Sequence, residues 1–103
     1  MIEVSFFKRD GRTVKVKCVG HSGLAQSGQD LLCAAVSTLI QTAYIALNDI
    51  SSGLGYKRKD GFFEFDVPSG EAAHDADVIV RAMYLGLKDL QSGFPQNLKL
   101  EEA

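Results

Sequence analysis

Residues 20–37 read GHSGLAQSGQDLLCAAVS, and this segment joins a predicted strand to a predicted helix. It begins with a histidine, His21, between glycines that permit backbone conformations which other residues resist. It ends with a cysteine, Cys33, in the first turns of an apolar helix. The segment therefore sets the change from sheet to helix, and it also contains the most reactive side chains of the chain.

The chain before this segment predicts a β-hairpin. Apolar and polar side chains alternate, as in half-buried strands, over residues 2–8 and 13–19. A three-residue loop at residues 9–11 would place Phe6 opposite Val14, whereas a two-residue loop would place it opposite Lys15. Since only the first choice keeps the apolar face continuous, we predict a three-residue loop that ends in a glycine bulge.

The chain after the segment begins with a long helix. Apolar residues recur every three or four positions, which is the period of one helical face, at Leu32, Val36, Leu39, Ala43, Leu47 and Ile50. Asp30 is expected at the start of this helix, either as its N-cap or in a capping box with Ser27. The helix is expected to end near Ser51, before Gly53.

The remaining residues repeat the order of hairpin and helix. Residues 54–59 and 62–67 predict a hairpin with a two-residue loop, which pairs Tyr56 with Phe65. A second helix is expected over about residues 71–91, with an apolar face formed by Ala76, Ile79, Val80, Met83, Leu87 and Leu90. Weak alternation over residues 97–101 is compatible with an extra C-terminal edge strand.

This order of elements, ββαββα, predicts an α+β fold in one domain spanning residues 1–103. Two hairpins that each have one apolar face need a cover, and two amphipathic helices supply it. The expected architecture is a two-layer sandwich with a mainly antiparallel sheet and both helices on one face.

The composition excludes several classes of partner. A formal net charge of -2 leaves no basic surface for direct nucleic-acid binding. No secretion signal is recognisable, and no uninterrupted apolar run approaches the roughly 20 residues of a membrane span. We therefore expect a cytoplasmic protein without membrane association, in which both cysteines stay reduced.

Cys33 and His21 are the candidate catalytic residues. Cys33 lies beside the apolar face of its helix rather than on it, in line with Ser37 and Ile40. The start of a helix and a nearby imidazolium both favour a thiolate. A histidine on a glycine-rich loop can take the proton of a thiol and later return it to a leaving amine. The alternative for Cys33 is a small side chain packed in the core.

Several neighbours of this pair have candidate supporting roles. Asp30 and Ser37 lie about one helical turn to either side of Cys33, where either could orient the imidazole. The loop residues Gly20, Ser22 and Gly23 would allow a peptide to approach His21 closely.

Two further patterns are weaker. Cys18 and His21 have the spacing of metal ligands, and Cys33 and His74 could complete a set of four. However, Cys18 shares a strand face with valines, which favours a core position, so we expect no metal. The basic residues 57–59 are expected to be solvated strand ends.

The motif that begins Gly20-His21-Ser22-Gly23 and ends in the run from Cys33 to Ser37 resembles the ribosomal-processing cysteine proteases of the Prp family. The likeness extends over nearly the whole chain, including its size and order of elements. It implies that His21 and Cys33 are a catalytic dyad that needs no cofactor. It also implies that the loop carrying the histidine is mobile.

The resemblance also implies a substrate. The family removes a short N-terminal extension from a large-subunit ribosomal protein, and it cleaves after a hydrophobic motif that contains phenylalanine. Its members are typically homodimers. The alternative function is a non-enzymatic, ribosome-associated binding module in which Cys33 is structural.

Overall fold

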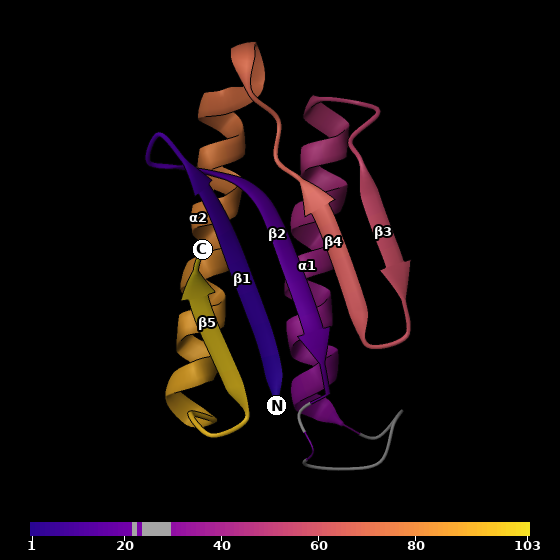
Figure 1. The fold of residues 1–103 in the computed structure, drawn as a ribbon, viewed down its shortest axis with the longest axis vertical. Coiled ribbons are helices and arrows are strands. Elements are labelled where there is room, and N and C mark those ends of the chain that lie inside the picture. The colour runs from indigo at the N-terminus through magenta and orange to yellow at the C-terminus, as the bar shows by residue number, and fades with distance from the viewer. Residues whose placement is uncertain (22, 24–29) are drawn as a thin grey trace.

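The computed structural model describes residues 1–21, 23 and 30–103. Figure 1 shows one sheet with two long helices lying side by side behind it. The elements, in chain order, are β1 Ile2–Arg9, β2 Arg12–Gly20, α1 Leu31–Ile50, β3 Tyr56–Lys59, β4 Phe62–Asp66, the short 3-10 turn Gly70–Ala72, α2 Ala73–Gly93 and β5 Leu98–Glu102. The predicted ββαββα order and the extra C-terminal strand are confirmed.

The sheet has the strand order β3-β4-β2-β1-β5. All neighbouring strands are antiparallel except β5, which pairs in parallel with β1 at one edge of the sheet. Both helices cover the same face (Figure 1), so the predicted two-layer α+β sandwich is confirmed.

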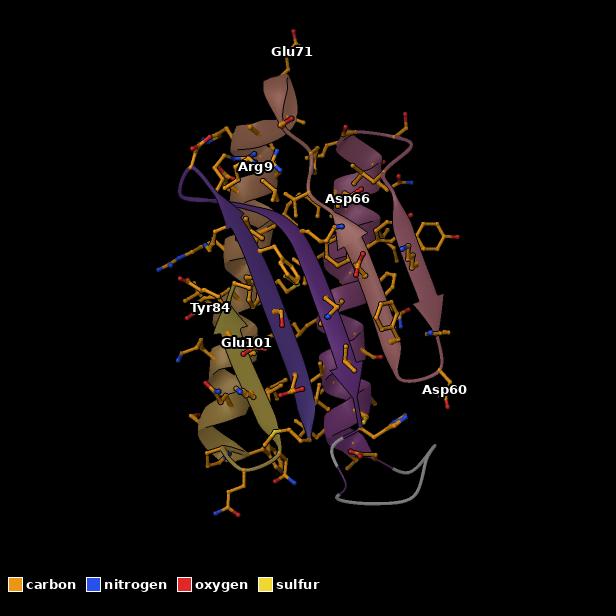
Figure 2. The ribbon with its side chains drawn as sticks, in the orientation of Figure 1. Arg9, Asp60, Asp66, Glu71, Tyr84 and Glu101 are labelled. Carbon is orange, nitrogen blue, oxygen red and sulfur yellow. The ribbon has the colours of Figure 1, made fainter. Side chains whose placement is uncertain are left out.

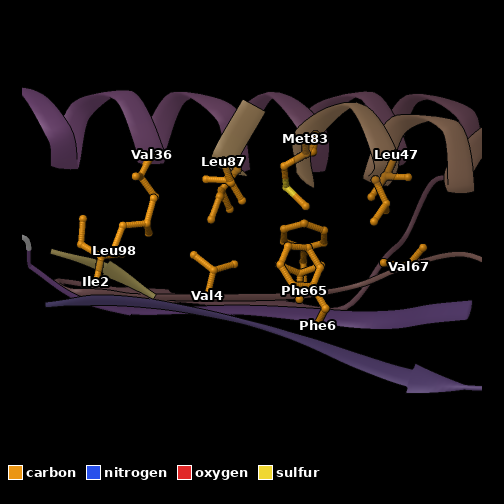
Figure 3. Close-up of a cluster of buried hydrophobic side chains, with 14 of the residues drawn as sticks. Ile2, Val4, Phe6, Val36, Leu47, Phe65, Val67, Met83, Leu87 and Leu98 are labelled. Carbon is orange, nitrogen blue, oxygen red and sulfur yellow. The ribbon is translucent and has the colours of Figure 1, made fainter. Parts of the chain in front are cut away.

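The core lies between the sheet and the two helices. Figure 3 shows the side chains of Ile2, Val4 and Phe6 pointing from β1 toward those of Val36 and Leu87 on the helices. On α1 the buried residues are Leu32, Val36, Ile40, Ala43 and Leu47. They follow the helical period, so hydrophobic burial against the sheet fixes which face of α1 points inward.

The first hairpin differs from the prediction. Asp10 and Gly11 both have positive φ angles, of 51° and 78°, and they form a two-residue loop. The ladder then shifts register between Phe7 and Lys8, so that Phe6 lies opposite Val16. A β-bulge inside β2, and not a glycine bulge in the loop, therefore keeps the apolar face continuous.

The second hairpin and both helices lie close to their predicted positions. Tyr56 pairs with Phe65 as predicted, although both strands are shorter than expected. The predicted face of α1 needs one correction, because Ile40 is buried whereas Ile50 is exposed. Leu31 and Ile45 are 85% and 66% exposed, so α1 is less enclosed than its composition indicates.

By length and composition alone, α1 could cross a membrane, since an 18-residue window within its 20 residues has a mean hydropathy of 1.5. In the structure the helix packs its buried face on the sheet, as the core helix of the two-layer fold does.

Candidate active site

A groove of about 840 Å³ lies between the N-terminal half of α1 and the β3–β4 hairpin. This volume falls within the range of small-ligand and peptide sites. The end of β2 and the start of β1 contribute to its base. In Figure 2, Asp60 projects from the β3–β4 turn at the end of the sheet where α1 begins. His21, Asp30, Cys33 and Ser37 all line this groove.

Cys33 is the third residue of α1 and is half-buried. One side of it packs against the core while another lines the groove. Its position beside the buried face of the helix, which the sequence predicts, makes the residue part of the lining of a surface groove. A peptide in the groove would therefore lie against it.

Asp30 is the N-cap of α1, as one of the two sequence alternatives predicts. The carboxylate Oδ1 accepts a hydrogen bond of 3.0 Å from the backbone N–H of Cys33. The backbone oxygen of Asp30 accepts another, also of 3.0 Å, from the N–H of Ala34. Only 7% of the residue is exposed. These bonds engage two amides that could otherwise stabilise an oxyanion, so an oxyanion hole would need other donors.

His21 lies at the end of β2, where its neighbours fix the backbone. Gly20 N–H donates a 2.8 Å hydrogen bond to the carbonyl oxygen of Gly61 in the β3–β4 turn. On the other side, the ammonium group of Met1 donates to the carbonyl oxygen of His21. The exposed imidazole rests on Gly61, since a Cβ built there would lie 2.9 Å from His21 Nε2.

Gly20 has a structural reason to be glycine. Its φ is +102°, and any Cβ would overlap the carbonyl group of Met1. Ser37 is exposed one turn beyond Cys33, where its side chain lines the groove. Gly23 is exposed with φ +78°. Ser22, and with it most of the loop expected to be mobile, lies outside the described residues, as does Ser27.

Cys18 also lines the groove. It pairs with Val4 on one side and Phe63 on the other, so it lies on the apolar face of the sheet, as predicted. Burial, and to a lesser extent the neighbouring Cys33, raises the pKa of Cys18 from 9.0 to about 11. Cys18 is therefore a protonated thiol at neutral pH.

The four residues whose spacing resembles that of metal ligands do not lie together in the structure, as a metal site would require. His74 lies exposed in the first turn of α2 and does not line the groove that contains Cys18 and Cys33. Within residues 1–21, 23 and 30–103, no three or more His, Cys, Asp or Glu side chains are placed to hold a metal ion.

Comparison with known proteins identifies the family. The family model described as cysteine protease Prp matches residues 1–99. The chain belongs to the Prp cysteine protease family. The ribosomal processing cysteine protease Prp of Bacillus subtilis is 27% identical over 97 residues, which cover 88% of this chain and 87% of that protein.

Solved protein structures share the fold. The essential ribosomal processing protease Prp from S. aureus, in complex with a covalently linked product peptide, superposes with a TM-score of 0.87 at 23% identity over the full length of both chains. SMU.848 from Streptococcus mutans gives a TM-score of 0.75 at 28% identity, over 100% of this chain and 96% of that one.

One wall of the groove in this Prp-family chain was missed by sequence reasoning. Tyr56, Arg58 and Phe63 line the groove from the hairpin, and Gln41 lines it from α1. The sequence predicts a solvated strand end for Arg58, and the residue is exposed as expected, but it also lines the groove. The available signal was the two-residue period of the strand, which places Arg58 on the same face as Tyr56.

Proposed function

We propose that this Prp-family chain is an endopeptidase that removes the N-terminal extension of a large-subunit ribosomal protein, with Cys33 as nucleophile and His21 as general base and acid. The observation that carries the proposal is that both side chains line one groove at the start of α1. Family membership supplies the reaction class, and the groove supplies a place for an extended peptide.

The chemistry follows the usual course of thiol proteases. His21 takes the proton from Cys33 Sγ, and the thiolate attacks the carbonyl carbon of the scissile peptide bond. The C–N bond breaks, and the amine leaves with the proton held by His21. Water, deprotonated by His21, then hydrolyses the thioester and regenerates the thiol. No step needs a cofactor.

The groove fits cleavage after a hydrophobic motif that contains phenylalanine. Ile40 lines it from α1, and Phe63 lines it from β4. An aromatic side chain of the substrate would bury apolar surface against the half-buried Phe63, at roughly 25 cal/mol for each Å² removed from water. The S. aureus relative has been solved with a substrate peptide, which supports a peptide as the occupant here.

The direct test is to incubate the extended ribosomal protein with the wild type, Cys33→Ala and His21→Ala, and to follow its mass. We expect loss of the extension with the wild type and no detectable cleavage with either variant. His74→Ala is the matched control for His21→Ala, because it removes the same type of side chain from a residue that does not line the groove. Equal cleavage by wild type and Cys33→Ala would overturn the proposal.

The alternative, a binding module with a structural Cys33, predicts a different thiol reactivity. In a Cys18→Ala background, iodoacetamide should modify a catalytic Cys33 faster than a small-molecule thiol, and His21→Ala should slow that reaction. A structural Cys33 would react only on unfolding. The half-buried position of Cys33 in the groove favours the catalytic role.

A cytoplasmic homodimer is part of the same proposal. Large apolar side chains remain exposed on α2, among them Val78 and Leu85. A second copy would remove such surface from water. Light scattering across a concentration series should give twice the mass of one chain, and a monomer at all concentrations would refute the dimer.

A further inference from the structure

We propose that Gln41 and Arg58 form a specificity-determining subsite that selects an acidic side chain of the substrate, three or four residues from the scissile bond. The inference rests on the proposed protease function and adds to it a preference that the family assignment does not contain. It is carried by two facing polar groups that line the groove away from Cys33.

The packing of two tyrosines places these groups opposite each other. The ring of Tyr56 on β3 lies 5.2 Å from that of Tyr44 on α1. Strand β3 and helix α1 run in opposite directions (Figure 1). Arg58 is therefore about 7 Å beyond Tyr56 in the direction of the turn. Gln41 is about 4.5 Å before Tyr44 in the same direction, so the two side chains lie at similar heights.

Both side chains have hydrogen-bonding capacity that the chain itself does not use. Among the residues that the structure describes, no carboxylate forms an ion pair with Arg58, and no group hydrogen-bonds to its guanidinium. The half-buried carboxamide of Gln41 likewise has no partner within the described residues.

The other charges near the hairpin are differently placed. Lys15, for comparison, lies 3.4 Å from Glu64. Lys59 also lines the groove, one residue nearer the turn than Arg58, and its ammonium group lies over the ring of Phe62. Of the carboxylates that line the groove, Asp30 caps α1, and Asp60 lies on the turn near His21.

The guanidinium of Arg58 and the carboxamide of Gln41 together can bind a carboxylate of the substrate. Arg58 can donate two parallel hydrogen bonds to it, and Gln41 can add a third through its NH₂ group. A lysine or arginine of the substrate would instead meet a like charge. The subsite therefore discriminates by charge, whereas the apolar part of the groove discriminates by shape and hydrophobicity.

The distance between Gln41 and Cys33 determines which substrate residue reaches the subsite. Gln41 is eight residues along α1 from Cys33, which is about 12 Å at the helical rise. An extended peptide advances about 3.3 Å per residue. The side chain that reaches Gln41 and Arg58 therefore belongs to the third or fourth residue from the bond that is cut.

The test uses peptides that differ only in one residue, Glu or Lys, placed in turn at the third and fourth positions on either side of the cut. At one of these positions we expect kcat/KM with Glu to exceed that with Lys roughly twofold to fivefold, as for a partly exposed ion pair. Arg58→Glu should reverse this order, and Gln41→Leu should reduce the preference for Glu.

Lys57→Glu is the matched control for charge. It makes the same change one residue away on β3, but it lies on the other face of the sheet, opposite Glu64. Thr42→Leu is the control for Gln41, since Thr42 is exposed on α1 and does not line the groove. Neither control should change the ratio of Glu to Lys peptides.

Peptide binding to the Cys33→Ala variant separates this inference from the proposed function. Tighter binding of the Glu peptide, abolished by Arg58→Glu, supports the subsite even if the wild type cleaves nothing, in which case the protease proposal alone fails. Equal handling of Glu and Lys peptides at all four positions, in cleavage and in binding, overturns the inference while leaving cleavage itself intact. A preference that Lys57→Glu changes as much as Arg58→Glu also overturns it.

Discussion

At the scale of single residues, Asp30 contributes to the site through the helix that it caps. Its carboxylate satisfies the N–H of Cys33, and its backbone oxygen begins the hydrogen-bond ladder of α1 at Ala34. A side-chain oxygen at an N-cap is worth about 1 kcal/mol of stability. The negative charge also lies at the positive end of the helix dipole. The residue therefore fixes the position of the turn that carries the thiol.

We predict that Asp30→Ala lowers the free energy of unfolding by about 1 kcal/mol, because it removes the cap. This corresponds to a fall in Tm of roughly 4–8 °C for a chain of this size, measured by circular dichroism. Asp30→Ser keeps a capping oxygen and should lose much less stability. If the two variants unfold alike, the capping role is wrong.

Cys18 gives a prediction about pH. Its pKa is 9.0 ordinarily and about 11 in the folded chain, because it is buried and lies near Cys33. Between these values the unfolded thiol has released its proton while the folded thiol still holds it. The stability contribution is therefore complete below pH 9 and is lost as the pH rises through 11, by roughly 2–3 kcal/mol in total.

The measurement is urea unfolding under reducing conditions at several pH values from about 8 to about 11. We expect the free energy of unfolding to fall with pH in the wild type, and to fall less steeply in Cys18→Ala. Identical slopes for the two proteins would show that Cys18 is not buried as described.

Some site residues can be predicted from the sequence because they carry local signals, whereas others come together only through long-range packing. His21 and Cys33 carry local signals, namely flanking glycines and a position beside an apolar helical face. Gln41 and Arg58 carry weaker signals, because a polar residue on a helix or an edge strand is ordinary and the strand period gives only the face on which Arg58 lies. They become a pair only when the packing of Tyr44 on Tyr56 aligns two segments that are distant in the chain.

At the scale of elements, the two hairpin turns differ in what they touch. Gly11 has φ +78° with nothing within 4 Å of a built Cβ, whereas Gly61 has φ +69° with His21 Nε2 only 2.9 Å away. The backbone strain of a substitution would be similar at both turns. Only at Gly61, in the turn of the second hairpin, would the substitution also displace the imidazole of His21.

We predict that Gly61→Ala and Gly11→Ala each lose about 1–2 kcal/mol of stability from a left-handed backbone. The ring of His21 can move aside, so the contact adds little to that loss. Displacing a catalytic group by about 1 Å can cost 100-fold in rate, so kcat/KM should fall only for Gly61→Ala. Equal activity in both variants would mean that Gly61 does not position His21.

The error in the first hairpin has its origin at this scale. A pattern of apolar residues fixes which face of each strand is buried, but it leaves loop length and bulges to compensate for each other. A three-residue loop without a bulge in β2 and a two-residue loop with one both keep Phe6 on the apolar face. The second hairpin was predictable because its Asp60-Gly61 loop fits its pairing without a bulge.

At the scale of the whole molecule, the groove exists because the two halves of the chain share one sheet. β2 and β4 are neighbours, so the hairpin of the second half lies against the end of the first. Neither half contains the groove alone, since α1, β2 and the β3–β4 hairpin each supply a side of it. The order of strands depends on these long-range pairings, which no local pattern of residues encodes.

Because the groove and the rest of the fold share one core, we expect them to unfold in a single transition. Leu47 on α1 is fully buried, and it lies 14 residues, about 21 Å, from Cys33. Leu47→Ala should lower the free energy of unfolding by about 2–5 kcal/mol, because it leaves a cavity. Ile45→Ala is the matched control, since it removes an apolar side chain from the same helix at a position that is 66% exposed.

Two probes should then report the same transition. In urea, the loss of helical signal and the exposure of Cys33 to alkylation, measured in a Cys18→Ala background, should share one midpoint. Leu47→Ala should move both midpoints down together, whereas Ile45→Ala should move neither by a comparable amount. Because α1 carries the thiol at one end and the core at the other, separate midpoints would mean that the N-terminal turn of α1 unfolds independently of the sheet that supports it.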